Sequence, residues 1–171
     1  MPEQWVQGLH RLLQLTFTLR LPAAPAAEVA AVRADLSAAT PYQHRLVHYV
    51  EDNPTNIEVM RGVLAQRAQI RLETSTLGLD GLAAIRARRP DLILLDMQLP
   101  DIPGIELLRH LKQDDALSGI PVVVVSADAT PAHVEQALVA GAARYVTKPV
   151  DLGSFLQIVD TLLEDIPTQW G

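Results

Sequence analysis

Two short stretches of this chain contain only branched apolar residues, LILL at residues 92–95 and VVVV at residues 122–125. A strand with one face in water alternates apolar and polar residues, whereas a strand covered on both faces is apolar throughout. Both faces of a sheet are covered when helices alternate with strands along the chain. The two stretches therefore predict central strands of a parallel sheet that lies between two layers of helices.

The same alternation continues through most of the chain. From residue 44 onward, β-rich apolar stretches alternate with segments of helical periodicity, and the expected strands are residues 46–50, 69–74, 91–95, 121–126 and 144–147. Capping signals agree with this, because Asn53 and Thr130 each precede a proline and Asp151 precedes the last helical segment. We expect an α/β fold with a doubly wound, five-stranded parallel sheet.

The first 43 residues have a different character. Residues 15–21 alternate apolar and polar side chains, which is typical of a half-buried strand, and an Ala- and Pro-rich stretch that resembles an interdomain linker follows. We expect three parts: an N-terminal segment with its linker in residues 1–43, one domain in residues 44–165 and a tail in residues 166–171.

The composition limits the function. The 171 residues carry a formal net charge of -6 without a block of Lys and Arg, so we expect no nucleic-acid binding. Cysteine is absent, which excludes disulfides and thiolate metal sites. Arg20, Pro22 and Pro25 interrupt the apolar run of the N-terminal region. We therefore expect a soluble, cytoplasmic protein that makes no membrane contact.

Polar residues follow the ends of the expected strands. Glu51 and Asp52 follow the first strand, Asp96 the third, Ser126 the fourth and Lys148 the fifth. Because the carboxyl ends of parallel strands meet at one edge of a sheet, we expect these side chains to lie together. Crowded carboxylates favour a hard divalent cation, and Mg²⁺ suits oxygen ligands best. The set predicts phosphoryl-transfer chemistry in which an aspartate is the nucleophile.

Five groups of residues at these strand ends resemble the response-regulator receiver family of two-component signalling. They are VEDNP at residues 50–54, LLDMQLP at 94–100, Gly104, VSA at 125–127 and YVTKP at 145–149. The resemblance spans about residues 44–165 and implies a flavodoxin-like, receiver-like sheet with strand order 2-1-3-4-5. It also implies a phosphorelay protein whose donor is a histidine kinase or a histidine phosphotransfer protein.

The resemblance assigns roles at the acidic edge. Asp96 would accept the phosphoryl group, and Mg²⁺ would be bound directly by Asp52 and Asp96, through a water by Glu51, and by the backbone carbonyl of Gln98. Lys148 is expected to neutralise one phosphoryl oxygen.

Other residues are expected to act after phosphorylation. Ser126 is expected to donate a hydrogen bond to the phosphoryl group, and Ser126 and Tyr145 would form the conformational switch. Gln98 and Asp128 lie two residues beyond Asp96 and Ser126. There they would flank the water that attacks the acyl phosphate, so we expect them to tune the rate of dephosphorylation.

The resemblance also suggests partners and an origin. The output surface would be the last helix–strand–helix unit, around residues 132–163, which is a possible homodimer face. Residues 15–22 are similar to the final strand of histidine-kinase ATPase domains, which points to the C-terminal receiver of a hybrid sensor histidine kinase. The glycine boxes that bind ATP are missing from this sequence, so we expect no kinase activity in this chain.

Three alternatives compete with a phosphorylated receiver. One is a degenerate receiver that folds, is never phosphorylated and acts as an interaction module. A haloacid-dehalogenase-like phosphohydrolase would need a second acid where Gln98 stands, and a flavodoxin-like cofactor site would place Glu51 and Asp52 against a phosphate. We therefore expect a phosphoacceptor with slow self-dephosphorylation and not an enzyme.

Overall fold

The computed structural model describes residues 45–164. The strand expected at residues 15–21, the linker and the tail at residues 166–171 lie outside the described residues. The described elements are, in chain order, β1 (Arg45–Val50), α3 (Pro54–Leu64), β2 (Ile70–Ser75), α4 (Gly78–Arg88), β3 (Leu92–Leu95), α5 (Gly104–Gln113), β4 (Val122–Ser126), α6 (Pro131–Val139), β5 (Arg144–Thr147) and α7 (Leu152–Glu164). Each expected strand from residue 46 onward is found within one residue of its expected bounds.

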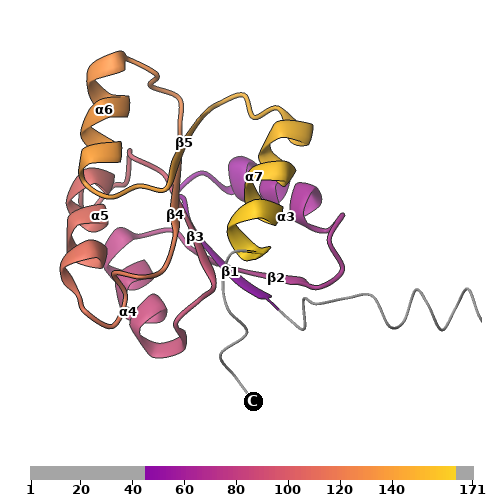
Figure 1. The fold of residues 1–171 in the computed structure, drawn as a ribbon, viewed down its shortest axis with the longest axis horizontal. Helices are drawn as coiled ribbons and strands as arrows, with labels where there is room; N and C mark the ends of the chain where they lie inside the picture. The colour runs from indigo at the N-terminus through magenta and orange to yellow at the C-terminus, as the bar shows by residue number, and fades with distance from the viewer. Residues whose placement is uncertain (1–44, 165–171) are drawn as a thin grey trace, which may run out of the picture. The chain divides into compact units, whose positions relative to one another are not determined.

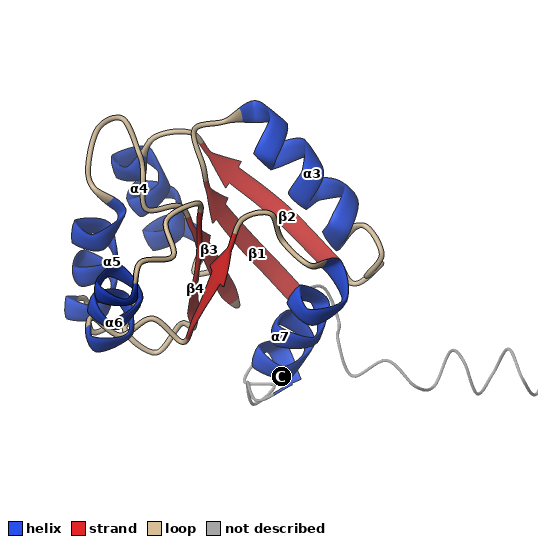
Figure 2. Cartoon of the chain, turned by 90° about the horizontal axis from the view of Figure 1, so that it is seen from above, coloured by secondary structure: helices blue, strands red, loops and turns tan. Residues whose placement is uncertain are grey.

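The five strands form one parallel sheet in the order β2-β1-β3-β4-β5. This confirms the predicted fold class and strand order. In Figures 1 and 2, α3 and α7 cover one face of the sheet while α4, α5 and α6 cover the other. Within residues 45–164, every helix is too short or too polar to span a lipid bilayer.

The sheet separates two apolar clusters. On the side of α3 and α7, Tyr49 and Phe155 are the largest fully buried side chains. Leu107, Leu108 and other residues of α4, α5 and α6 pack against the opposite face. All residues of β3 and the four valines of β4 are fully buried, as the two apolar stretches predict. Burial of each such side chain stabilises the fold by roughly 1.5–3 kcal/mol.

Two of the three expected capping residues make a side-chain hydrogen bond to their helix. The side chain of Asn53 accepts a hydrogen bond from the Thr55 amide at 2.9 Å, and Asp151 accepts one from the Ser154 amide at 2.9 Å. Thr130 takes the expected N-cap position of α6, followed by Pro131, but its side chain makes no capping hydrogen bond. Its amide instead donates to the Asp128 carboxylate at 2.9 Å, so an acidic residue two positions earlier organises this turn.

A distant residue caps α4. Asp101, in the loop between β3 and α5, accepts hydrogen bonds from the amides of Gly78 at 2.7 Å and Leu79 at 2.8 Å. These amide donors hold the pKa of Asp101 below its usual range, the Leu79 amide most strongly. A Cβ on Gly78 would lie 2.4 Å from a side-chain atom of Ile102. The loop that follows β3 is therefore held tightly against the start of α4.

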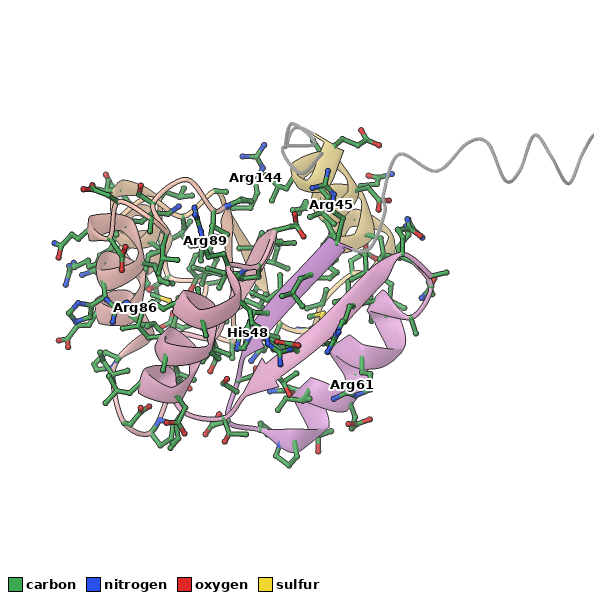
Figure 3. All side chains as sticks on the ribbon, turned by 90° about the horizontal axis from the view of Figure 1, so that it is seen from below. Arg45, His48, Arg61, Arg86, Arg89 and Arg144 are labelled. Atoms are coloured by element: carbon green, nitrogen blue, oxygen red, sulfur yellow. The ribbon has the colours of Figure 1, made fainter. Side chains whose placement is uncertain are left out.

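His48 of β1 is 3% exposed and lies between β2 and α4, with its Nε2 atom 2.9 Å from the Ser75 hydroxyl (Figure 3). Burial lowers the pKa of His48, although the nearby charge of Glu73 acts to raise it. The unfolded chain therefore binds more protons than the folded chain just below the ordinary histidine pKa, and stability decreases as the pH falls through that region.

We expect the temperature of the unfolding midpoint to decrease when the pH is lowered from about 7.5 to about 5.5. This decrease should be smaller in His48→Gln than in the natural chain. Differential scanning fluorimetry over that pH range measures this difference. His110→Gln is the control because His110 is exposed, and it should retain the full decrease. An equal decrease in His48→Gln would contradict the assignment to His48.

Candidate functional site

Three carboxylates meet at the carboxyl edge of the sheet. Glu51, Asp52 and Asp96 each offer an oxygen atom within 4.8 Å of the others. The first two follow β1 and the third follows β3, and these two strands are adjacent in the sheet. The Asp96 amide donates to the Val50 carbonyl at 3.0 Å and so continues the β1–β3 ladder by one residue. Parallel pairing of two buried strands therefore brings the acidic side chains together.

Lys148 reaches this cluster from the end of β5. Its Nζ atom lies 2.6 Å from Glu51 Oε2 and 3.1 Å from Asp96 Oδ1. Its amide donates to the Ser126 carbonyl at 2.9 Å, which places the residue beside the end of β4. Three carboxylates face one ammonium group here, so the cluster retains an excess of negative charge. Such an excess favours a divalent cation or a second positive group.

Glu51 is held by a network of donors. The Tyr49 hydroxyl donates to Oε2, while the Asn56 side-chain amide donates to Oε1 at 2.9 Å and the Asn53 backbone amide at 3.3 Å. Burial opposes ionisation of Glu51, but the hydrogen bonds, that of Lys148 first, prevail and lower its pKa. Burial and then Glu51 raise the pKa of Tyr49, which therefore stays a neutral donor.

Sequence reasoning did not identify Tyr49 or Asn56 as part of this site. Tyr49 lies two residues before Glu51, the spacing at which side chains of a strand share one face, and this period was the available signal. Asn56 is three residues beyond the cap of α3 and carries no comparable signal in the sequence.

Asp96 differs from Glu51 in its ionisation. Burial is the main influence and raises the pKa of Asp96, with a further increase from the charge of Glu51, although Lys148 acts in the opposite direction. Oδ2 accepts the Gln98 amide at 3.2 Å, while Oδ1 faces Lys148. Asp52 is exposed, and within residues 45–164 its carboxylate makes no hydrogen bond or ion pair. These oxygen donors fit Mg²⁺ chemically.

Ser126, Asp128 and Tyr145 lie around a cavity of about 160 Å³ next to the acidic cluster. The Asp128 amide donates to the Ser126 hydroxyl at 3.3 Å, and the Tyr145 hydroxyl donates to the Asp128 carbonyl. The cavity is lined by Met97, Gln98, Ile105, Ser126, Asp128, His133, Gln136 and Tyr145. The cavity thus lies between the loop after β3, the end of β4 and the middle of β5.

The structure defines an α/β protein with a doubly wound sheet, at whose carboxyl edge three carboxylates and a lysine lie together. The chain belongs to the response regulator receiver domain family, which matches residues 47–160. Members of this family are phosphoacceptors that bind Mg²⁺ at an acidic pocket and interact with histidine kinases or phosphotransfer proteins. This membership confirms the predicted phosphoacceptor receiver function and does not favour the phosphohydrolase alternative.

Several known proteins are similar to this chain. The polar-differentiation response regulator DivK of Brucella anthropi is 36% identical over 119 residues, which are 70% of this chain and 96% of DivK. The structure of the phosphorylated cyanobacterial phytochrome response regulator RcpA is 33% identical with a TM-score of 0.62, over 71% of this chain and 92% of RcpA. The Mn²⁺-bound response regulator Rcp1 is 27% identical with a TM-score of 0.62, over 72% of this chain and 97% of Rcp1.

Proposed function

We propose that this receiver domain takes a phosphoryl group from a phosphohistidine donor onto Asp96 in the presence of Mg²⁺ and then changes a protein-binding surface. The observation that carries the proposal is the position of Lys148, whose Nζ atom lies 3.1 Å from an Asp96 carboxylate oxygen inside a cluster of three carboxylates. The phosphorylated state of RcpA and the Mn²⁺ bound to Rcp1 support the same chemistry in similar proteins.

The residues of the acidic cluster have different roles in the proposed phosphoryl transfer. A carboxylate oxygen of Asp96 attacks phosphorus, and the bond from phosphorus to the donor nitrogen breaks. The other ring nitrogen of the phosphohistidine carries a proton, so the histidine leaves as a neutral imidazole. Asp52 and Asp96 would bind Mg²⁺ directly, Glu51 through a water, and Gln98 through its backbone carbonyl. A bound Mg²⁺ would supply positive charge to the phosphoryl oxygens.

Lys148 would also bind the incoming phosphoryl group. Its ammonium group lies between Glu51 and Asp96, so it can exchange its Asp96 contact for a phosphoryl oxygen while Glu51 keeps it in place. The lowered pKa of Glu51 keeps this carboxylate ionised, which suits both Lys148 and a divalent cation.

Ser126 and Tyr145 form the proposed switch. The Ser126 hydroxyl, at the end of the buried strand β4, would donate to the phosphoryl group. The Asp128 amide already contacts that hydroxyl, and the Asp128 carbonyl accepts from Tyr145, so a movement of Ser126 is passed to β5 through one residue. The surface formed by α6, β5 and α7 would bind the output partner or a second copy of the chain.

The test is phosphorylation by a small donor. Incubation with acetyl phosphate and Mg²⁺ should add the mass of one phosphoryl group to the natural chain and nothing to Asp96→Asn, as measured by intact-protein mass spectrometry. Asp80→Asn removes an exposed carboxylate of α4 and should still gain the mass. No gain in the natural chain would support the degenerate receiver, and a gain that persists in Asp96→Asn would exclude Asp96 as the acceptor.

Several finer points stay predictions. The division of the chain at about residue 44, the origin in a hybrid sensor kinase and the cytoplasmic location rest on the sequence alone. Slow self-dephosphorylation, tuned by Gln98 and Asp128, is likewise part of the proposal.

A further inference from the structure

The side chain of Asp128 is directed to helix α6 by two contacts. Its Oδ1 atom accepts the Thr130 amide at 2.9 Å, and its Oδ2 atom lies 2.6 Å from Nδ1 of His133. These contacts, that of the Thr130 amide first, hold the pKa of Asp128 below its usual range, so the group is a carboxylate at neutral pH. Both oxygens therefore already have partners, one at the N-cap of α6 and one in its first turn.

The same carboxylate borders the space beside the phosphoacceptor. Asp128 and His133 share the cavity of about 160 Å³ with Gln98 and Ser126, which lie two residues after Asp96 and at the end of β4. A carboxylate at this place can accept a hydrogen bond from a water in the cavity. While His133 engages Oδ2, that oxygen is directed to α6 and not to such a water.

We propose that His133 is a positioning residue that prolongs the phosphorylated state by holding the Asp128 carboxylate against α6. The inference rests on the proposed phosphorylation of Asp96. In hydrolysis, the oxygen of a water attacks phosphorus, the bond from phosphorus to the Asp96 oxygen breaks, and Asp96 leaves as a carboxylate. The water proton passes to a base and then to inorganic phosphate. A carboxylate that accepts this proton accelerates the step, and His133 keeps Asp128 from doing so.

The contact between His133 and Asp128 has little structural weight. The His133 side chain is 56% exposed and that of Asp128 is 35% exposed, and pairs in such surroundings contribute little to stability. When His133 is replaced, the Thr130 amide still donates to the Asp128 Oδ1 atom, and the Tyr145 hydroxyl still donates to the Asp128 backbone carbonyl. Loss of the imidazole should therefore change the rate of dephosphorylation and leave the midpoint of thermal unfolding unchanged.

The test measures the decay of the phosphorylated form. Each variant is loaded with acetyl phosphate and Mg²⁺, the donor is removed by rapid desalting, and the remaining phosphorylated fraction is followed by mass spectrometry. His133→Ala should lose the phosphoryl group about threefold to tenfold faster than the natural chain, a part of what a positioned base supplies. His133→Asn, which can place a side-chain nitrogen near the position of Nδ1, should restore slow decay. Glu135→Ala, an exposed change on the same helix, should decay at the natural rate.

A double variant separates positioning from a general effect on α6. If His133 acts through Asp128, the decay of His133→Ala with Asp128→Ala should match that of Asp128→Ala alone. An unchanged or slower decay in His133→Ala, or an acceleration that persists without Asp128, would overturn the inference and leave the phosphorylation of Asp96 intact. Failure of the natural chain to gain a phosphoryl group would overturn both.

Discussion

Replacement of Lys148 by methionine is expected to abolish the accumulation of phosphorylated protein and to lower the free energy of unfolding by about 3 kcal/mol. The Glu51 and Asp96 side chains are only 1% and 7% exposed, and the Lys148 ammonium group lies within hydrogen-bonding distance of both. Removal of one partner from a buried ionic cluster leaves the remaining charges without compensation. Methionine keeps most of the volume, so the loss reflects charge and not a cavity.

The two effects are measured separately. Urea unfolding gives the free energy, and acetyl phosphate loading gives the phosphorylated fraction. Because a cation can replace the lost charge, Mg²⁺ should raise the stability of Lys148→Met more than that of the natural chain. Lys112→Met is the control, since the Lys112 ammonium group is bound by the carbonyls of Ser118 and Ile120, away from the cluster. It should lose some stability and still be phosphorylated. Full stability and normal loading of Lys148→Met would refute the proposed role.

A single methyl group at Gly104 should have an effect of similar size. A Cβ atom there would lie 2.3 Å from the carbonyl oxygen of Asp96 and 2.6 Å from Cα of Met97. Both are backbone atoms, so relief of the overlap requires movement of the chain that carries Asp96. We expect Gly104→Ala to lower the free energy of unfolding by about 3 kcal/mol, at the upper end of overpacking effects, and to reduce the phosphorylated fraction strongly.

Gly62→Ala is the matched control for this substitution. Gly62 is an exposed residue of α3, and a Cβ atom there would have no atom within 4 Å. Because alanine has the higher helix propensity, this change should raise the free energy of unfolding by up to about 1 kcal/mol. Chemical denaturation of both variants provides the comparison. A Gly104→Ala variant as stable as the natural chain would show that the loop after β3 adapts more easily than its contacts indicate.

The sheet could be predicted from the sequence because each strand is marked by a short pattern of neighbouring residues. The stretches at residues 92–95 and 122–125 are apolar throughout, and each ends at the polar residue that begins the site. The position of Asp96 beside Lys148 follows from parallel pairing once the strands are known. The fold and the residues of the acidic cluster were therefore accessible from the sequence.

The hydrogen-bond partners were less accessible. Asp101 caps α4 although it lies more than twenty residues further along the chain, and no local sequence pattern predicts such a contact. At the start of α6, Asp128 and Thr130 both offer a suitable oxygen, and only the geometry of the turn selects Asp128. The contact of His133 was missed for the same reason, since a histidine five residues beyond an aspartate has many other possible partners.

The division of the core by the sheet has an evolutionary consequence. Tyr145 packs with the cluster beneath α4, α5 and α6, whereas its neighbour Val146 packs with the cluster of α3 and α7. Met97 and Ile105, which line the cavity, also pack against the cluster beneath α4, α5 and α6. Under α3 and α7, Tyr49 is tied to the site through its hydrogen bond to Glu51, whereas the other apolar side chains of that cluster affect the site only through the stability of the fold. If the proposed switch operates, substitutions under α5 and α6 would also alter the lifetime of the phosphorylated state, so most of the α3/α7 face could diversify while the other face is constrained by regulation.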